Sequence, residues 1–185
     1  MHVFRSGHST IIDEIAEELN EEPGVVITCC GGGGLLCGII EGMRRHQWTS
    51  VPVMAMETTG TASFNACVQN GGKAVTLDKW SGLAVSLSPI RVCDQLVQYY
   101  RESKPPIVSY LVEDKDVVDS CVKFADDHRF LVETSCGTAL SAVYKGLVNK
   151  VINEFDVKQK AIVVIVCGGA AIDLNSLNRW KHEYL

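Results

Sequence analysis

Four consecutive glycines, Gly31 to Gly34, stand between a run of residues typical of a β-strand and a run typical of a helix. The strand run covers residues 25–30, and the helical run begins at Leu35. A chain that turns from a strand into a helix through residues without Cβ directs several backbone N–H groups at one point, next to the positive end of the helix dipole. An anionic group fits such a point. The glycines therefore predict a phosphate pocket.

A flexible surface turn is the alternative interpretation of these glycines. One or two glycines are enough for an ordinary turn, and four in a row cost conformational entropy, so we favour the anion site. The spacing matches neither G-x-G-x-x-G followed by an acidic residue about 20 positions later nor G-x-x-x-x-G-K-[ST]. A dinucleotide or a Walker-type nucleotide is therefore not the first candidate ligand.

Length and composition indicate one soluble domain over residues 1–185, since 46% of the residues are hydrophobic and 21% are charged. The net charge of −5 and the scattered Lys and Arg residues give no basic stripe, so we expect neither nucleic acid nor a membrane as a partner. A small molecule remains as the expected partner. Residues 1–5 do not resemble a signal peptide, and the expected location is the cytoplasm.

The eight cysteines favour free, reduced thiols over disulfides, because most of them lie inside apolar segments. No C-x-x-C pair is present, and the five histidines neither cluster nor pair at helical spacing. A zinc site is therefore not expected.

Strands alternate with helices along the chain, which predicts an α/β fold with a doubly wound, mostly parallel sheet and helices on both faces. The run 161–166 is apolar at every position, as is typical of a central parallel strand that is covered on both faces. Ligands of such folds bind at the carboxyl ends of the strands, where Gly31, Glu57 and Cys167 would lie. The expected strands are 25–30, 51–57, 107–112 and 161–166, and the expected helices are 9–20 with Ser9 as its cap, 35–46, 64–69, 92–102, 114–128 and 136–154.

Four motifs in the same order carry a resemblance to a known family. They are the glycine loop and residues 56–64, 132–140 and 164–169. Together they closely resemble the pyridoxal-phosphate-dependent L-serine dehydratase and L-threonine deaminase family of fold type II. Four motifs at matching spacing are far more specific than any one of them alone.

The resemblance implies pyridoxal 5′-phosphate as the cofactor and assigns its contacts. Cys167 is similar to the family's partner of the pyridine nitrogen. A neutral thiol does not keep that nitrogen protonated, so the ring is a weaker electron sink and prompt loss of a β-leaving group is favoured. Without the motif, a packed thiol at a strand end is the preferred interpretation of Cys167. The phosphate, in agreement with the anion pocket, would be held by Gly31, Gly32, Gly33, Gly34 and the amide of Leu35.

The resemblance also implies a cation site with oxygen ligands, which suit a hard cation. Its ligands would be Glu57, Ser63 and the backbone carbonyls of Thr61, Leu83 and Val85. Related serine racemases carry Asp at the position of Ser63 and take a divalent ion, so the lower charge here points to a monovalent ion such as potassium. A solvated or helix-capping carboxylate is the alternative role of Glu57.

The family's Schiff-base lysine belongs to an S-x-K-x-R-G motif in a smaller upstream domain, and these 185 residues contain no such motif. We therefore assign no catalytic residue here, and Glu133 is expected only to cap the helix that follows it or to bond its free N–H groups. The expectation is a cofactor-domain fragment, or a truncated gene model, in which the small lysine-bearing domain is missing.

The function expected of the complete enzyme is β-elimination of L-serine and L-threonine to pyruvate or 2-oxobutyrate and ammonia. The enzyme would act as a homodimer, and this chain alone would be inactive. The alternative is a paralogue without the lysine that binds a phosphate-bearing ligand or regulates an intact dehydratase subunit.

Overall fold

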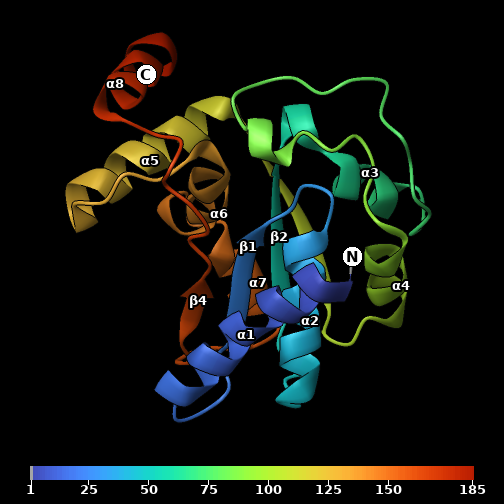
Figure 1. The fold of residues 1–185 in the computed structure, drawn as a ribbon. Helices are drawn as coiled ribbons and strands as arrows, with labels where there is room; N and C mark the ends of the chain where they lie inside the picture. The colour runs from blue at the N-terminus through green and yellow to red at the C-terminus, as the bar shows by residue number, and fades with distance from the viewer. Residues whose placement is uncertain (1) are drawn as a thin grey trace.

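The computed structural model describes the backbone of residues 2–185 and the side chains of residues 6–185. Helices and strands alternate along most of the chain (Figure 1). The strands are β1 (Val25–Cys29), β2 (Val53–Thr58), β3 (Ile107–Val112) and β4 (Ile162–Val164). The helices are α1 (His2–Glu18), α2 (Gly34–Arg45), α3 (Ser63–Gln69), α4 (Asp94–Glu102), α5 (Asp114–His128), α6 (Thr134–Tyr144), α7 (Val148–Glu154) and α8 (Leu174–Tyr184), with short 3-10 turns η1 (Thr59–Thr61) and η2 (Val85–Leu87).

The strands form a parallel sheet in the order β3-β2-β1-β4 between two layers of helices. Successive side chains of β1 point to opposite faces of the sheet and so contribute to two separate cores. Val26 packs with α1, α2 and α4, whereas Val25 and Ile27 pack with α5, α6 and α7. β1 and β2 are buried along their whole length. The predicted α/β class with a doubly wound parallel sheet is confirmed.

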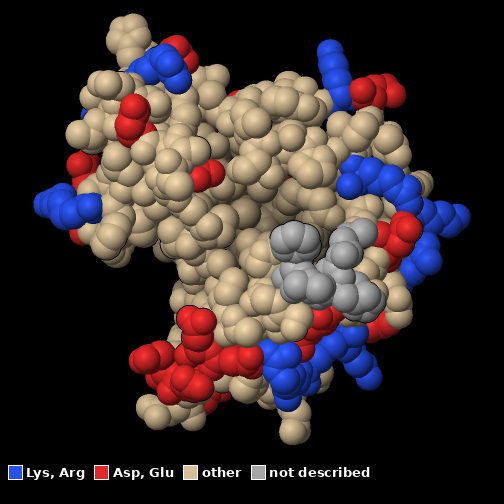
Figure 2. Space-filling view, viewed as in Figure 1, with Lys and Arg blue, Asp and Glu red and all other residues tan. Residues whose placement is uncertain are grey.

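Acidic side chains gather on the surface at the C-terminal end of α1, where the sequence places Glu14, Glu17, Glu18 and Glu21 (Figure 2). Lys and Arg are scattered over the rest of this face. Within the described residues, no helix has both the length and the apolar character that crossing a membrane requires.

The predicted start of the first helix at Ser9 is wrong, because α1 begins at His2. Ser9 lies inside the helix, where its Oγ donates a hydrogen bond to the carbonyl of Ser6 at 2.8 Å. The apolar repeat that predicts the helix begins only at Ile11, so it marks the buried stretch of α1 and misses the preceding turns.

The predicted helix 136–154 is two helices, α6 and α7, that meet at Gly146. Gly146 has a φ of 67°, and its N–H donates to the carbonyl of Val143 at 2.9 Å. A left-handed glycine ends a helix at low steric cost. The apolar positions continue on both sides of this break and therefore conceal it in the sequence.

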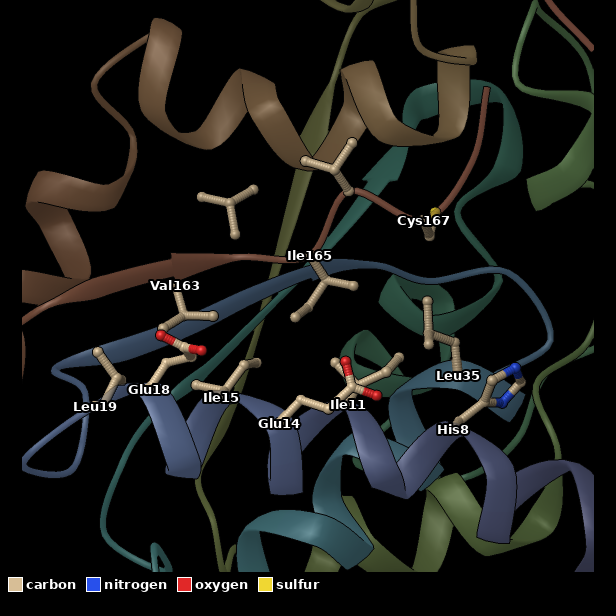
Figure 3. A pocket seen from close by; sticks show the side chains of 12 residues that line it. His8, Ile11, Glu14, Ile15, Glu18, Leu19, Leu35, Val163, Ile165 and Cys167 are labelled. Carbon is tan, nitrogen blue, oxygen red and sulfur yellow. The ribbon is translucent and has the colours of Figure 1, made fainter. Parts of the chain in front are cut away.

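The prediction that 161–166 is a central strand is also wrong, because β4 lies at the edge of the sheet and pairs with β1. One face of β4 borders a groove of about 700 Å³, across which Val163 of β4 and Ile165 just after it face Ile11 and Ile15 of α1 (Figure 3). Ile162 is 41% exposed. A strand that is apolar at every position is stable when both of its faces are buried. Within the described residues, neighbouring elements bury β4 only in part.

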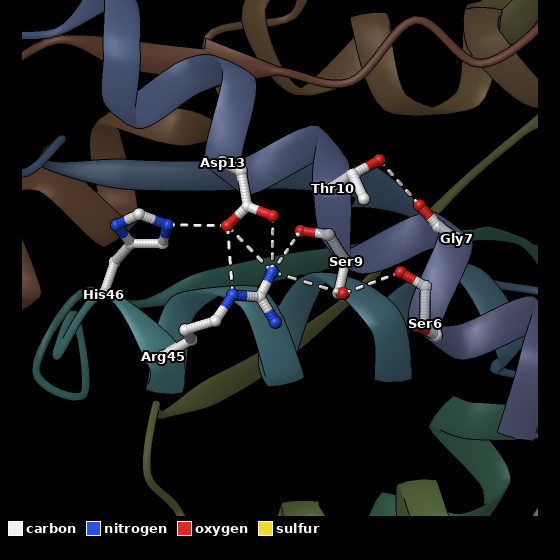
Figure 4. Close-up of polar contacts among 7 residues, drawn as sticks. All are labelled: Ser6, Gly7, Ser9, Thr10, Asp13, Arg45 and His46. Carbon is white, nitrogen blue, oxygen red and sulfur yellow. Dashed lines mark hydrogen bonds and ion pairs between the residues drawn. The ribbon is translucent and has the colours of Figure 1, made fainter.

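A polar cluster fastens the end of α2 to α1 (Figure 4). The Nε and Nη2 atoms of Arg45 donate to the carboxylate of Asp13 at 3.0 and 2.7 Å, and Nη2 also donates to the carbonyl of Ser9 at 3.1 Å. His46 Nε2 lies 2.7 Å from the same carboxylate. The hydrogen bonds from Arg45 and His46 lower the pKa of Asp13. Ion pairs that are partly exposed contribute little to stability. The distance between α1 and α2 is therefore set mainly by their close packing at Gly42 of α2.

We predict that Gly42→Ala destabilises the protein by about 1–3 kcal/mol, because overpacking forces the two closely packed helices α1 and α2 apart. A Cβ at Gly42 would stand 2.6 Å from the carbonyl oxygen of Ser9 and 2.7 Å from Cβ of Ile12. Gly7→Ala is the matched control, since a Cβ at this glycine of α1 meets no atom within 4 Å. Urea denaturation measures both variants, and equal stabilities would contradict the prediction.

Candidate functional site

The glycine loop joins the carboxyl end of β1 to the start of α2. The N–H of Cys30 donates to the carbonyl of Met56 at 2.8 Å and keeps the chain on the sheet until the loop begins. The first hydrogen bond inside α2 runs from the N–H of Cys37 to the carbonyl of Gly33 at 2.9 Å. The N–H groups of Gly34, Leu35 and Leu36 therefore have no acceptor within the helix, and they lie at the positive end of its dipole.

Two glycines of the loop are present for different physical reasons. Gly33 has a φ of 92°, and a Cβ there would lie 2.8 Å from Cδ2 of Leu96, so both the backbone conformation and the packing require glycine. A Cβ at Gly34 would meet no protein atom within 4 Å. Packing therefore does not require glycine at position 34, which lines a cavity and leaves space there for a ligand.

The middle of the loop is held against the segment that leads into α4. The carbonyl of Gly32 accepts a hydrogen bond from the N–H of Cys93 at 2.9 Å. A Cβ at Gly32 would stand 3.4 Å from the ring of Pro89, which is ordinary van der Waals contact. The Gly32 carbonyl therefore anchors the backbone of the loop to the segment before α4, while the loop residues line a cavity.

This cavity has a volume of about 210 Å³ and lies at the carboxyl edge of the sheet. Its walls bring together the glycine loop and Cys167, which are far apart in the sequence. All the predicted cofactor-binding residues line it, namely Gly31, Gly32, Gly33, Gly34, Leu35 and Cys167. Its walls also contain Cys29, Cys30, Leu36, Ser86, Leu87 and Ser135.

Cys167 follows β4 and lies between two other thiols. Its Sγ is 3.6 Å from Sγ of Cys29 at the end of β1 and 3.6 Å from Sγ of Cys136 in α6. The hydrogen bond with Cys136 lowers the pKa of Cys167, but the hydrogen bond toward Cys29 and burial outweigh it and raise the pKa to about 11. Cys167 is therefore a neutral thiol at pH 7, with an S–H group beside the cavity.

The loop that carries Cys167 is attached to the start of α6. The N–H of Gly168 donates to Sγ of Cys136 at 3.1 Å, and the N–H of Glu133 donates to the carbonyl of Gly168 at 3.3 Å. Glu133 occupies the N-cap position of α6, but its side chain makes no capping hydrogen bond there. The expected cap is wrong. Its carboxylate accepts a hydrogen bond from the N–H of Ala171 at 3.3 Å and supports the Cys167 loop.

Glu57 lies at the end of β2, and its side chain is fully buried. Its two carboxylate oxygens accept hydrogen bonds from the N–H groups of Phe64 and Asn65, both at 2.7 Å, at the start of α3. This is the helix-capping role that the sequence left open. Burial raises the pKa of Glu57 to about 7, although the two hydrogen bonds act to lower it.

The other predicted cation ligands lie on two loops that touch. Thr61 and Ser63 follow Glu57, and Ser63 Oγ lies 3.5 Å from the carbonyl oxygen of Gly31 in the glycine loop. Leu83 and Val85 belong to the second loop, which meets the first where the N–H of Ser81 donates to the carbonyl of Gly60 at 2.9 Å. The Leu83 carbonyl already accepts hydrogen bonds from the N–H of Val85 and the hydroxyl of Thr134. Cation binding here stays a prediction.

Sequence reasoning missed the polar residues that complete the cavity, above all Ser135 and Cys29. Ser135 stands in the first turn of α6, and Cys29 ends the strand just before the glycines. The rule that strand ends share one edge could have indicated Cys29. Ser135 lies within the motif 132–140, but nothing in that motif distinguishes it from its neighbours as a cavity residue, because its position depends on how α6 packs on the sheet.

Comparisons with known proteins agree with this geometry. Residues 2–168 match the family described as pyridoxal-phosphate dependent enzyme. The chain is 42% identical over 179 residues to a Bos taurus protein named L-serine dehydratase/L-threonine deaminase, covering 96% of this chain and 54% of that protein. The human protein of the same name is 40% identical, with the same coverage. The chain thus spans about half the length of the curated relatives it matches.

Solved structures show the same similarity. The crystal structure of a fungal L-serine ammonia-lyase from Rhizomucor miehei matches 98% of this chain with a TM-score of 0.90 and 36% identity, and the match covers 56% of that chain. Maize serine racemase shares the fold, with a TM-score of 0.76 and 22% identity over 98% of this chain and 54% of its own.

We predict that Glu57 makes the protein less stable as the pH rises. The folded pKa of about 7 lies above the ordinary value of 4.5, so the contribution to stability is present below about pH 4.5 and is lost as the pH rises through 7. The loss reaches about 3 kcal/mol. Urea denaturation from pH 4.5 to 8 should show this slope in the wild type, whereas Glu57→Gln removes it. Glu17→Gln, on an exposed residue of α1, should keep the wild-type slope, and a slope that survives in Glu57→Gln would contradict the assignment.

Proposed function

The chain belongs to the family of pyridoxal-phosphate-dependent enzymes, and from this premise we propose that it forms the cofactor-binding part of an L-serine dehydratase. One observation supports the proposal most directly: the glycine loop and Cys167 line the same small cavity. The donors of this cavity also fit the cofactor. Backbone N–H groups at a helix N-terminus suit a phosphate ester, and a neutral thiol suits an unprotonated pyridine nitrogen.

Each residue has a distinct role in this proposal. The N–H groups of Gly31 to Gly34 and Leu35 hold the phosphate, and the space beside Gly34 accommodates it. The S–H group of Cys167 donates a hydrogen bond to the pyridine nitrogen without transferring its proton, because the thiol stays neutral near pH 7. The bound cofactor supplies an electron sink for the bond changes at the amino acid.

The substrates we propose for the complete enzyme are L-serine and L-threonine, which would lose their β-hydroxyl group and yield pyruvate or 2-oxobutyrate and ammonia. Proteins named for these activities support the choice. The 185 residues contain no S-x-K-x-R-G lysine motif. We therefore propose that residues 1–185, taken alone, bind the cofactor and release no pyruvate from L-serine.

A paralogue that binds a phosphate-bearing ligand without catalysis remains the second candidate function, and the same lack of a lysine motif favours it. The two candidates differ in what a complete assembly does. If a polypeptide that carries the motif joins this chain, the dehydratase proposal requires pyruvate formation from L-serine, whereas the second candidate requires none.

The proposal extends to a bound potassium ion, a homodimer and a cytoplasmic location. The buried carboxylate of Glu57, with the hydroxyl of Ser63 and the carbonyls of Thr61, Leu83 and Val85 as the other expected oxygen ligands, supports a hard monovalent cation. The partly exposed apolar edge at β4 supports association with a second copy of the chain.

We predict that Gly34→Ala leaves the fold intact and weakens ligand binding at least about tenfold, because the new methyl group meets no protein atom and narrows the phosphate site. The probe is pyridoxine 5′-phosphate, which has no aldehyde that reacts with surface lysines, and equilibrium dialysis measures its affinity. Gly7→Ala is the control, since its Cβ is equally free of contacts and Gly7 of α1 does not line the glycine-loop cavity. Binding of pyridoxine without phosphate should be weak in all three proteins. Equal affinity of wild type and Gly34→Ala would contradict the phosphate site.

We predict that potassium chloride stabilises the protein at pH 8 but not at pH 5, because only the ionised carboxylate of Glu57 attracts the cation. Thermal unfolding in potassium chloride is compared with unfolding in choline chloride at equal ionic strength, which separates a bound ion from screening. The Glu57→Gln variant should show no difference between the two salts. A wild type that is indifferent to potassium at pH 8 would refute the cation site.

A further inference from the structure

Three thiols meet at the edge of the sheet, and Cys167 is the exposed one. Its sulfur lies 3.6 Å from the sulfurs of both Cys29 and Cys136, which are buried. Cys167 borders the groove beside α1 (Figure 3). It also lines the glycine-loop cavity and a pocket beside Phe130. A small oxidant therefore reaches Cys167 directly, and the glycine-loop cavity, which Cys29 also lines, connects the two thiols.

We propose that Cys167 is a redox modification site at which a peroxide produces a disulfide with Cys29. A disulfide requires an Sγ–Sγ distance of about 2.05 Å, so the present gap of 3.6 Å must close by about 1.5 Å. Ile165 is still hydrogen-bonded to β1, but residues 166–169 lie outside regular secondary structure and can supply this movement if the hydrogen bonds of Gly168 to Glu133 and Cys136 adjust. The parallel strands that lead to the two cysteines pair at Ile27 and Val164, so the two chains leave the sheet side by side.

Cys29 is a better partner than Cys136 for a geometric reason. The sulfur of Cys136 contacts both the N–H and the carbonyl of Gly168 at 3.1 Å, and a disulfide would break these contacts. Cys136 also lies inside α6 and is fully buried. Within the described residues, the sulfur of Cys29 makes no backbone hydrogen bond of this kind, and its contact is with Cys167 itself.

The chemistry uses one molecule of hydrogen peroxide as the two-electron oxidant. The sulfur of Cys167 attacks one peroxide oxygen, the O–O bond breaks, and the leaving hydroxide takes a proton to become water, which leaves a sulfenic acid. The sulfur of Cys29 then attacks the sulfenic sulfur, the S–O bond breaks, and hydroxide leaves with the proton of Cys29 as a second water. Two thiols are oxidised and one peroxide is reduced.

A disulfide would remove the S–H group of Cys167 from the glycine-loop cavity. The neutral state of Cys167 makes the first oxidation step slow near pH 7, because the thiolate is the reacting form. The site therefore responds to sustained oxidant and differs from a fast peroxide sensor.

The test is a disulfide map of the purified wild-type protein after treatment with hydrogen peroxide. Remaining thiols are alkylated under denaturing conditions, and digested peptides are identified by mass spectrometry. We expect a cross-linked peptide pair that contains Cys29 and Cys167, with a loss of two of the eight free thiols. A map in which Cys167 pairs with Cys136, or in which Cys167 is oxidised without any disulfide, would overturn the proposal.

Variants make the assignment specific. In Cys29→Ser, or in Cys29→Ala if the serine variant folds poorly, the cross-link should be absent and the sulfenic acid at Cys167 should persist, so that trapping by dimedone rises at least about tenfold. Cys67→Ser removes a buried thiol of α3 and serves as the control, with the cross-link at wild-type yield. An undiminished loss of two thiols in Cys29→Ser would contradict Cys29 as the partner.

A separate arm distinguishes this inference from the proposed function. Pyridoxine 5′-phosphate should slow formation of the cross-link severalfold if it lies against Cys167. A cross-link that forms at the same rate with and without this ligand would contradict the proposed contact with the cofactor and would leave the disulfide site intact.

Discussion

The site depends on one structural constraint, which is the turn from β1 into α2 at the carboxyl edge of the sheet. Gly33 adopts a positive φ against Leu96, and this conformation starts α2 at residues that line the cavity. Any side chain at Gly33 would push on Leu96, which belongs to the core between the sheet and α4. The helix that carries the N–H groups is therefore fixed by the same packing that holds the domain together. An anion site built in this way needs no charged side chain, since its donors belong to the backbone.

Predictions from the sequence were reliable where the local pattern and the tertiary structure follow the same rule. The expected strand 107–112 and helix 114–128 agree with β3 and α5, because most of their apolar positions are also positions that pack. The sequence predicts that the glycine loop and Cys167 share one edge, and the structure places both on one cavity. That expectation needed only the parallel topology, in which all strand ends point the same way.

The failures have a common physical origin. Apolar residues report which positions require burial, but they do not report where a helix begins, where it breaks or what covers a strand. The first turns of α1 carry no apolar repeat, and Gly146 divides a continuous apolar pattern through its backbone conformation. For β4, the apolar pattern indicates that both faces should be buried. It does not indicate which elements bury them, or whether the strand lies at the centre or at the edge of the sheet. Ser135 reaches the cavity through the packing of α6, which no short stretch of sequence encodes.

Glu57 shows how one buried charge links the stability of the domain to its site. The carboxylate caps α3, and the loop that it stabilises also places Ser63 beside the carbonyl of Gly31 in the glycine loop. Burial penalises the ionised form that accepts these hydrogen bonds best. A cation near the carboxylate would remove this penalty, hold the two loops together and thereby stiffen the phosphate site. The cation would then act through the geometry of the backbone, with no part in the bond changes at the substrate.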